Sequence, residues 1–147
     1  MGRKRVFVTG MGIFCPLGGE IKKFWNNLTQ GESGVHHLNR FDSTLSLTQV
    51  AGIIQNYDAK DYFSPREQRS CEAFVQYGLL AAREAITQSE ITDPDLAKCA
   101  VVAGTGIGGI VSYKPAYDAL YLPETNKKIN AFTIPKMMNN ALSAQIA

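Results

Sequence analysis

The chain has 147 residues, of which 45% are hydrophobic and 19% charged, and its formal net charge at pH 7 is +2. This composition is typical of a globular protein and excludes a disordered chain, while the small net charge without a long basic run argues against nucleic-acid binding. The apolar run after the basic residues 1–5 is short and broken by glycines, so we predict neither a signal peptide nor a membrane-inserted segment, and we expect a cytoplasmic protein.

The first predicted element is a buried strand over Arg5–Gly10, "RVFVTG", because this run is rich in β-branched residues and is closed by glycine. A loop rich in glycine and proline follows. A helix is then predicted to end at Gly31, with one apolar face formed by Ile21, Phe24, Trp25 and Leu28. Residues 35–63 are predicted to be irregular, with one or two strands, the clearest at "LTQVAGII".

The strongest helix start lies at Ser64, where Pro65 and Glu67 complete a capping box with a proline in the first turn. We expect one helix from there that includes Cys71. Its predicted buried face consists mainly of small side chains, which would let a neighbouring segment pack very close. These residues are Phe74, Gly78, Ala81, Ala82 and Ala85.

The C-terminal third is predicted to begin with a strand over Lys98–Gly106. A helix from about Gly108, interrupted by Pro115, is expected next, followed by a turn-rich segment, "LPETNKKIN". A last helix is predicted to begin at Pro135. No helix stop signal precedes Ala147, so we expect the chain to be truncated within this helix.

The stretch "GTGIGG" matches the dinucleotide-binding pattern G-x-G-x-x-G from Gly104 to Gly109. Its context fits that pattern poorly, because Pro115 interrupts the following helix and Glu124, at the distance of the ribose-binding acid, lies in a turn without a strand before it. We therefore favour a tight turn in which Ile107 faces a cavity. A nucleotide-binding α/β protein remains the alternative.

The cysteines and histidines form no recognisable site. Cys15, Cys71 and Cys99 are odd in number and far apart, which indicates reduced thiols, and each is interpreted as a small buried side chain. His36 and His37 are adjacent and cannot face one ligand together, so a solvated loop pair is favoured over a metal site.

Taken in order, six segments make the chain resemble the N-terminal part of the β-ketoacyl-acyl-carrier-protein synthases, most closely the FabF-like elongating condensing enzymes of the thiolase fold. The segments are "RVFVTGMGIFCPLG", "FWNNLTQGESGV" with "RFD", "AGIIQNYD", "SPREQRSCEAFVQYGLLAAREAI", "VVAGTGIGGI" and "IPKMMNN". The resemblance implies a layered α/β/α fold of the α/β class, of which residues 1–147 are an incomplete N-terminal domain.

Enzymes of this family transfer an acyl group to a cysteine and condense it with a decarboxylated malonyl thioester, with the help of two histidines. The resemblance places all three catalytic residues after Ala147, so none of the residues present is assigned a catalytic role. It implies no organic cofactor, an acyl carrier protein as partner, and a homodimer when the protein is complete. A non-catalytic chain-length-factor-like subunit of a heterodimer remains an alternative.

The resemblance also assigns positions in an acyl pocket. Ile107, between Gly106 and Gly108, matches the residue that projects into the acyl-chain pocket and can act as a gate. Thr133 and Met138 match positions that reach the pocket of the partner subunit. Thr133 replaces a common phenylalanine, which leaves the chain-length preference open.

Arg66 and Arg69 match basic positions near the pocket mouth, where an acidic carrier protein would dock. The alternative is a solvated helix face on which these arginines lie beside Glu67 and Glu72.

Overall fold

The computed structural model describes residues 4–39, 41–92, 95, 97–122 and 128–147. The chain forms two compact units. One comprises residues 1–57 and 80–93, and the other residues 58–79 and 94–147. Helix α3 (Ala73–Ser89) contributes residues to both. No helix in the described part of the chain is both long enough and apolar enough to cross a lipid bilayer.

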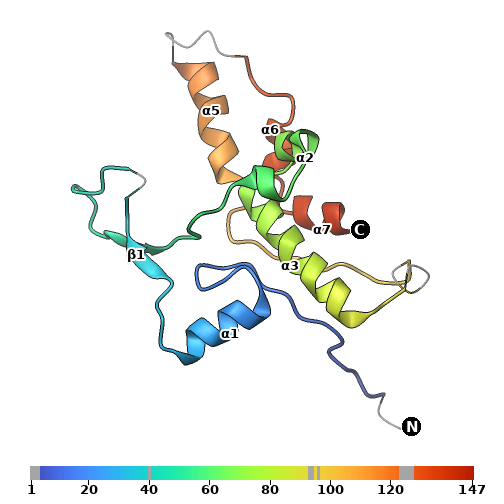
Figure 1. Ribbon diagram of the computed structural model, residues 1–147. Coiled ribbons are helices and arrows are strands. Elements are labelled where there is room, and N and C mark those ends of the chain that lie inside the picture. The colour runs from blue at the N-terminus through green and yellow to red at the C-terminus, as the bar shows by residue number, and fades with distance from the viewer. Residues whose placement is uncertain (1–3, 40, 93–94, 96, 123–127) are drawn as a thin grey trace. The chain divides into compact units, whose positions relative to one another are not determined.

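Helix α1 (Ile21–Thr29) belongs to the first unit and ends where the sequence predicts (Figure 1). Gly31 has φ of +76°, a left-handed conformation that glycine adopts without steric cost. Its N–H donates to the Leu28 carbonyl (3.1 Å), and the N–H of Glu32 donates to the Asn27 carbonyl (3.0 Å). These bonds satisfy carbonyls that the helix end would leave unpaired, so the predicted glycine stop is confirmed.

Strands β1 (Val35–His37) and β2 (Val50–Gly52) form an antiparallel pair in the first unit. Val35 pairs with Gly52 and His37 with Val50. The predicted strand in "LTQVAGII" is therefore confirmed. His36 and His37 are exposed but lie in β1, so their predicted placement in a loop was wrong.

The loop before α1 is fastened to α3 within the first unit. The two carboxylate oxygens of Glu84 accept the backbone N–H groups of Ile13 (3.0 Å) and Ile21 (2.8 Å). Ile21 is the first residue of α1, and its N-cap Glu20 supplies no side-chain cap, so Glu84 takes that role from another helix. Gln88 accepts the N–H of Met11 (2.6 Å) in the same way.

Two glycines of this loop approach the backbone of α3 directly. A Cβ at Gly10 would collide with the carbonyl oxygen of Ala85, and one at Gly12 with that of Ala81. Close packing against the small residues of α3 is thus confirmed. The predicted buried face was only partly right, because the buried side chains of α3 are Val75, Gln76 and Leu79.

Two predicted strands were wrong, since Arg5–Gly10 and Lys98–Gly106 form no strand in the structure. Val6 is 93% exposed and Val102 is 96% exposed. A β-branched run becomes a strand only where a second strand accepts and donates its backbone hydrogen bonds. In the described residues β1 and β2 pair only with each other, and neither run has such a neighbour.

The second unit begins with the short helix η1 (Ala59–Asp61) and helix α2 (Pro65–Ser70). The capping box of α2 is confirmed, because Ser64 and Glu67 exchange side-chain and backbone hydrogen bonds. The single long helix was wrong: Cys71 is extended, with φ of −113° and ψ of 129°, and separates α2 from α3. Gln76 stabilises this break by donating from Nε2 to the Cys71 carbonyl (3.1 Å).

Helix α5 (Ile110–Tyr121) packs against α6 (Thr133–Met137), which is followed by α7 (Ala141–Ile146) (Figure 1). The expected interruption at Pro115 was wrong, because α5 runs through it. Proline removes the N–H that would bond to the Val111 carbonyl, yet the helix continues beyond it to Tyr121. The predicted last helix is divided where Met138 is extended, and its first part starts at Thr133 instead of Pro135.

The turn-rich segment 122–130 lies largely outside the described residues, as does Glu124. The buried apolar side chains of the second unit come from the η1–α2 connection, the α2–α3 break and α3. They are Phe63, Cys71, Val75 and Leu79.

Candidate functional site

Residues 105–109 form a tight loop before α5 in the second unit. The N–H of Gly108 donates to the Thr105 hydroxyl (3.1 Å), and the N–H of Gly109 donates to the Met137 carbonyl (3.4 Å). Gly108 has φ of +70°, and a Cβ there would lie 2.8 Å from the Met137 oxygen. The predicted tight turn is therefore confirmed, and both its conformation and its packing require glycine at position 108.

Ile107 carries the bulkiest side chain of this loop and is 69% exposed. It is not among the residues that line the hollow described next. A Cβ at Gly106 would have no described atom within 4 Å, so the loop is open on that side. The role of Ile107 as an acyl gate stays a prediction.

A hollow of about 490 Å³ lies in the second unit between the α2–α3 break, α5 and the start of α6. Thr133 lines it and is only 7% exposed, whereas Met138 is 47% exposed. The N–H of Thr133 donates to the Asn130 carbonyl (2.9 Å) at the start of α6. Thr133, one of the five residues predicted for an acyl pocket, lines the hollow. Gly108, another of the five, packs against the carbonyl of Met137, the residue before Met138.

Glu72 does not lie on the solvated helix face that was the alternative interpretation of Arg66 and Arg69. It is 9% exposed and lines the hollow. Its Oε1 accepts the backbone N–H of Ser112, the third residue of α5. A Cβ at Gly109 would collide with its Oε2, so the carboxylate packs directly on the helix start. A carboxylate is favourable there because the N-terminal N–H groups are unpaired and carry partial positive charge.

The sequence contains a weak indication that Glu72 lies at a helix start. An acidic residue directly before the apolar run of α3 is typical of a helix N-terminus. Nothing local indicates that its side chain turns to α5 instead, because Ser112 is far away in the sequence.

Arg66 and Arg69 both lie on α2 and are exposed. The neighbouring carboxylate of Glu67 is held by the capping box, where its Oε2 accepts the Ser64 N–H (2.7 Å). The docking role of the two arginines stays a prediction.

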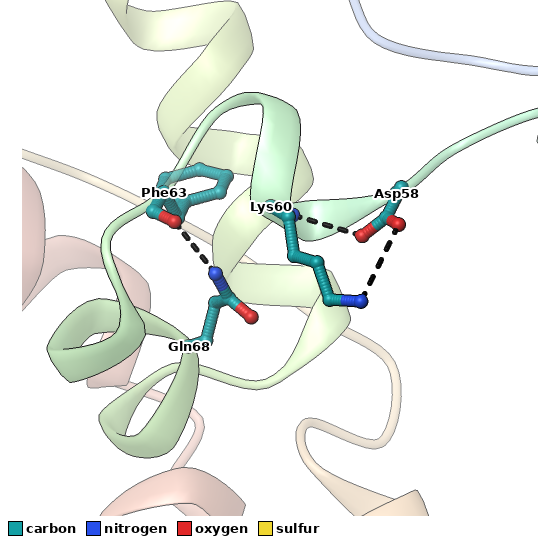
Figure 2. Close-up of polar contacts among 4 residues, drawn as sticks. All are labelled: Asp58, Lys60, Phe63 and Gln68. Carbon is teal, nitrogen blue, oxygen red and sulfur yellow. Dashed lines mark hydrogen bonds and ion pairs between the residues drawn. The ribbon is translucent and has the colours of Figure 1, made fainter.

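The connection into α2 is fixed by side chains as well (Figure 2). Asp58 accepts the N–H of Lys60 (2.9 Å), and its second oxygen lies 4.0 Å from the Lys60 ammonium. Gln68 donates from Nε2 to the Phe63 carbonyl (2.6 Å). These contacts hold the chain on both sides of Ser64, so the helix that carries the arginines has a defined start.

The three cysteines differ in their surroundings. Cys71 is buried and Cys15 half-buried, as expected for small apolar side chains, but Cys99 is exposed, so that prediction was wrong for Cys99. Its thiol donates to the Asp95 carbonyl (3.4 Å), and Cys99 directly follows a turn instead of starting a strand. Within the described ranges, no cluster of His, Cys, Asp and Glu side chains could hold a metal ion.

Comparison with known proteins places these features in a family. Residues 3–147 match the family model described as "Beta-ketoacyl synthase, N-terminal domain". The chain is 32% identical to the 3-oxoacyl-(acyl-carrier-protein) synthase 2 of Vibrio harveyi, an alignment that covers 100% of this chain and 36% of that protein. The chain thus spans about a third of the length of the curated relatives it matches.

Two solved structures share the fold. A β-ketoacyl synthase from Burkholderia phymatum STM815 superposes with a TM-score of 0.79 at 20% identity, over 98% of this chain and 36% of the other. A type II PKS ketosynthase, bound to a hexaketide and in complex with its acyl-carrier protein, gives a TM-score of 0.69 at 22% identity, over 98% of this chain and 38% of the other. The fold is therefore the thiolase-like α/β fold of the ketosynthases. The chain belongs to the β-ketoacyl synthase family and corresponds to its N-terminal domain.

Proposed function

We propose that the complete protein is an elongating β-ketoacyl-acyl-carrier-protein synthase. It joins an acyl thioester to malonyl-acyl carrier protein by decarboxylative Claisen condensation, in fatty acid or polyketide synthesis. The observation that carries this proposal is the family match over residues 3–147, supported by relatives named for the same reaction. The nucleophilic cysteine and the two histidines are proposed to lie beyond residue 147.

Residues 1–147 are proposed to be part of a layered α/β/α domain. The superposition on a solved β-ketoacyl synthase, with a TM-score of 0.79 over 98% of this chain, supports this.

The acyl pocket is proposed to include Ile107, with Gly106 and Gly108 beside it, and Thr133 and Met138 from the partner subunit of a homodimer. The support from geometry is a fixed loop backbone from which the Ile107 side chain projects without being packed into the described core. Such an arrangement lets one side chain change position while its backbone stays in place.

Docking of acyl carrier protein is proposed at Arg66 and Arg69, which are exposed on a well-capped helix. Their charge would mainly accelerate association with an acidic partner. A cytoplasmic location is proposed with this function; the free thiols of Cys15, Cys71 and Cys99 agree with a reducing compartment.

The direct test is a condensation assay with the complete protein, acyl-acyl carrier protein and malonyl-acyl carrier protein. We expect a 3-oxoacyl product two carbons longer and one carbon dioxide per product, and no turnover from residues 1–147 alone. A complete protein without condensing activity would contradict the proposal.

Two further observations would then distinguish the alternatives. A residue other than cysteine at the nucleophile position would favour the chain-length-factor alternative. Saturable NADH binding that Gly106→Val abolishes would favour the nucleotide-binding alternative.

The gate is tested by Ile107→Ala in the complete protein. Removing the branched side chain should raise kcat/KM for long acyl chains relative to short ones, by about tenfold, the effect of a few methylene groups in a hydrophobic pocket. An unchanged preference would refute the role of Ile107 without touching the proposed reaction.

A further inference from the structure

The start of α5 lacks a cap of its own. Its N-cap residue, Gly109, has no side chain, and no local side-chain hydrogen bond is made there. The first-turn N–H of Ser112 donates both to the Gly109 carbonyl (3.2 Å) and to the Glu72 carboxylate. The cap of α5 is therefore supplied by a residue of a different element.

Glu72 is itself held firmly in place. On one side the N–H of Cys71 donates to the Glu67 carbonyl (2.8 Å), which ends α2. On the other, the N–H of Gln76 donates to the Glu72 carbonyl (3.0 Å) at the start of α3. A carboxylate with a fixed backbone on both sides is a rigid acceptor, able to determine where its donor lies.

The donor, Ser112, lies in the first turn of α5, directly after the loop that carries Ile107. Three contacts fix residues 105–112: the Thr105 hydroxyl holds Gly108, the Met137 carbonyl holds Gly109, and the Glu72 carboxylate holds Ser112. The first two are bonds between neutral groups. The third is charge-assisted and is the stronger kind. Gly109 allows this packing, because a Cβ there would collide first with the backbone carbonyl of Lys136 and then with the Glu72 carboxylate.

We propose that Glu72 is a positioning residue for the Ile107 loop, so that the acyl-chain selectivity of the complete protein depends on a carboxylate that does not contact the acyl chain. The link to selectivity rests on the function proposed above. The effect on the loop does not, because it follows from the hydrogen bond to Ser112 alone. Glu72→Ala frees the start of α5, and Glu72→Asp withdraws the carboxylate by one methylene group.

The first measurement is amide hydrogen exchange over residues 105–112 of the complete protein. Both variants should raise the exchange rate there by about tenfold or more, since the N–H of Ser112 loses its charged acceptor. Glu72→Gln keeps an acceptor oxygen and should restore much of the protection. Unchanged exchange in both Glu72→Asp and Glu72→Ala would overturn the proposal whether or not the protein condenses acyl chains.

The second measurement is the ratio of kcat/KM for long and short acyl chains. Glu72→Asp should shift this ratio at least about threefold, and Glu72→Gln should return it toward the original value. The matched control is Glu67→Ala, which removes the Glu67 half of the capping box of α2 and should lower stability with the ratio unchanged. If Glu72 had a merely structural role, its variants would leave the kcat/KM ratio unchanged, as Glu67→Ala should. Faster amide exchange over residues 105–112 with an unchanged ratio would therefore refute the link to selectivity. If Ile107→Ala also leaves the ratio unchanged, the proposed gate has failed instead.

Discussion

The backbone N–H of Ser112 donates to the carboxylate of Glu72, which lies 40 residues earlier in the sequence. The same device occurs in the other unit, where the N–H of Ile21 donates to Glu84. In both cases a glycine-rich loop leads into a helix whose own N-cap supplies no side-chain bond. A carboxylate from elsewhere replaces the local cap, and the folding of the helix start thereby depends on tertiary structure.

Glu84→Ala should lower the free energy of unfolding of the complete protein by about 2 kcal/mol, because two part-buried N–H groups, of Ile13 and Ile21, lose a charged acceptor. Glu84→Gln retains one acceptor oxygen and should lose about half as much. Chemical denaturation followed by circular dichroism gives both values. Glu32→Ala, an exposed acidic residue of the same unit, is the control and should change stability by less than about 0.5 kcal/mol. Equal losses for Glu84→Ala and Glu32→Ala would contradict the role of Glu84.

Gly12→Ala should destabilise the protein by about 3 kcal/mol, the upper end of the usual cost of overpacking. The added methyl group would meet the carbonyl of Ala81 and lie 2.9 Å from the nitrogen of Ala85, and neither helix backbone atom can move alone. The midpoint of thermal unfolding is the readout. Gly104→Ala is the matched control, since no described atom lies within 4 Å of its Cβ position. A Gly12→Ala protein as stable as this control would show that the loop does not approach α3 this closely.

Gly31→Ala should cost about 1 kcal/mol, because an alanine in the left-handed conformation at φ of +76° is strained although no described atom lies within 4 Å of its Cβ position. Gly31→Asn should cost clearly less, since asparagine tolerates this conformation. Urea unfolding of the two variants side by side checks the order. If the alanine variant were the more stable one, strain at this position would be excluded.

The carboxylate of Asp42 accepts the hydroxyl (2.7 Å) and the backbone N–H (3.0 Å) of Thr44, and these bonds hold the pKa of Asp42 below its ordinary value. Because the pKa of Asp42 is lower in the folded state, its carboxylate stabilises that state at pH values above the ordinary aspartate pKa. This contribution to the free energy of unfolding is lost as the pH falls through the lowered pKa. Thr44→Val removes the hydroxyl donor but keeps the N–H, so the pKa of Asp42 should rise part of the way back. Carboxyl-carbon NMR titration measures it. A pKa that stays the same after this substitution would mean that the hydroxyl does not contribute.

The sequence predicts well those features that neighbouring residues determine. The capping box at Ser64 and the glycine stop at Gly31 depend on a few adjacent groups, and both are confirmed. The run Arg5–Gly10 has an equally clear pattern but forms no strand, because a strand needs a partner that the pattern cannot specify.

In the candidate site, too, the features determined by neighbouring residues could be predicted, and those determined by distant residues could not. The tight turn at Gly108 could be predicted from the glycines alone. The break at Cys71 could not, because it is stabilised by Gln76 and lets the next residue, Glu72, reach α5. An acidic residue within an apparently continuous helix is ordinarily placed on the solvated face, and only the distant Ser112 reverses that assignment.

Glu84 has a further consequence for how the N-terminal loop tolerates change. By holding Ile13 with one oxygen and Ile21 with the other, it closes residues 14–20 into a ring, as a covalent cross-link would. The entropy of closing a ring grows only slowly with its size, by about 0.6 kcal/mol for each doubling in length. Relatives can therefore differ in the length of this loop at little cost, provided that a carboxylate at position 84 still spans its two ends.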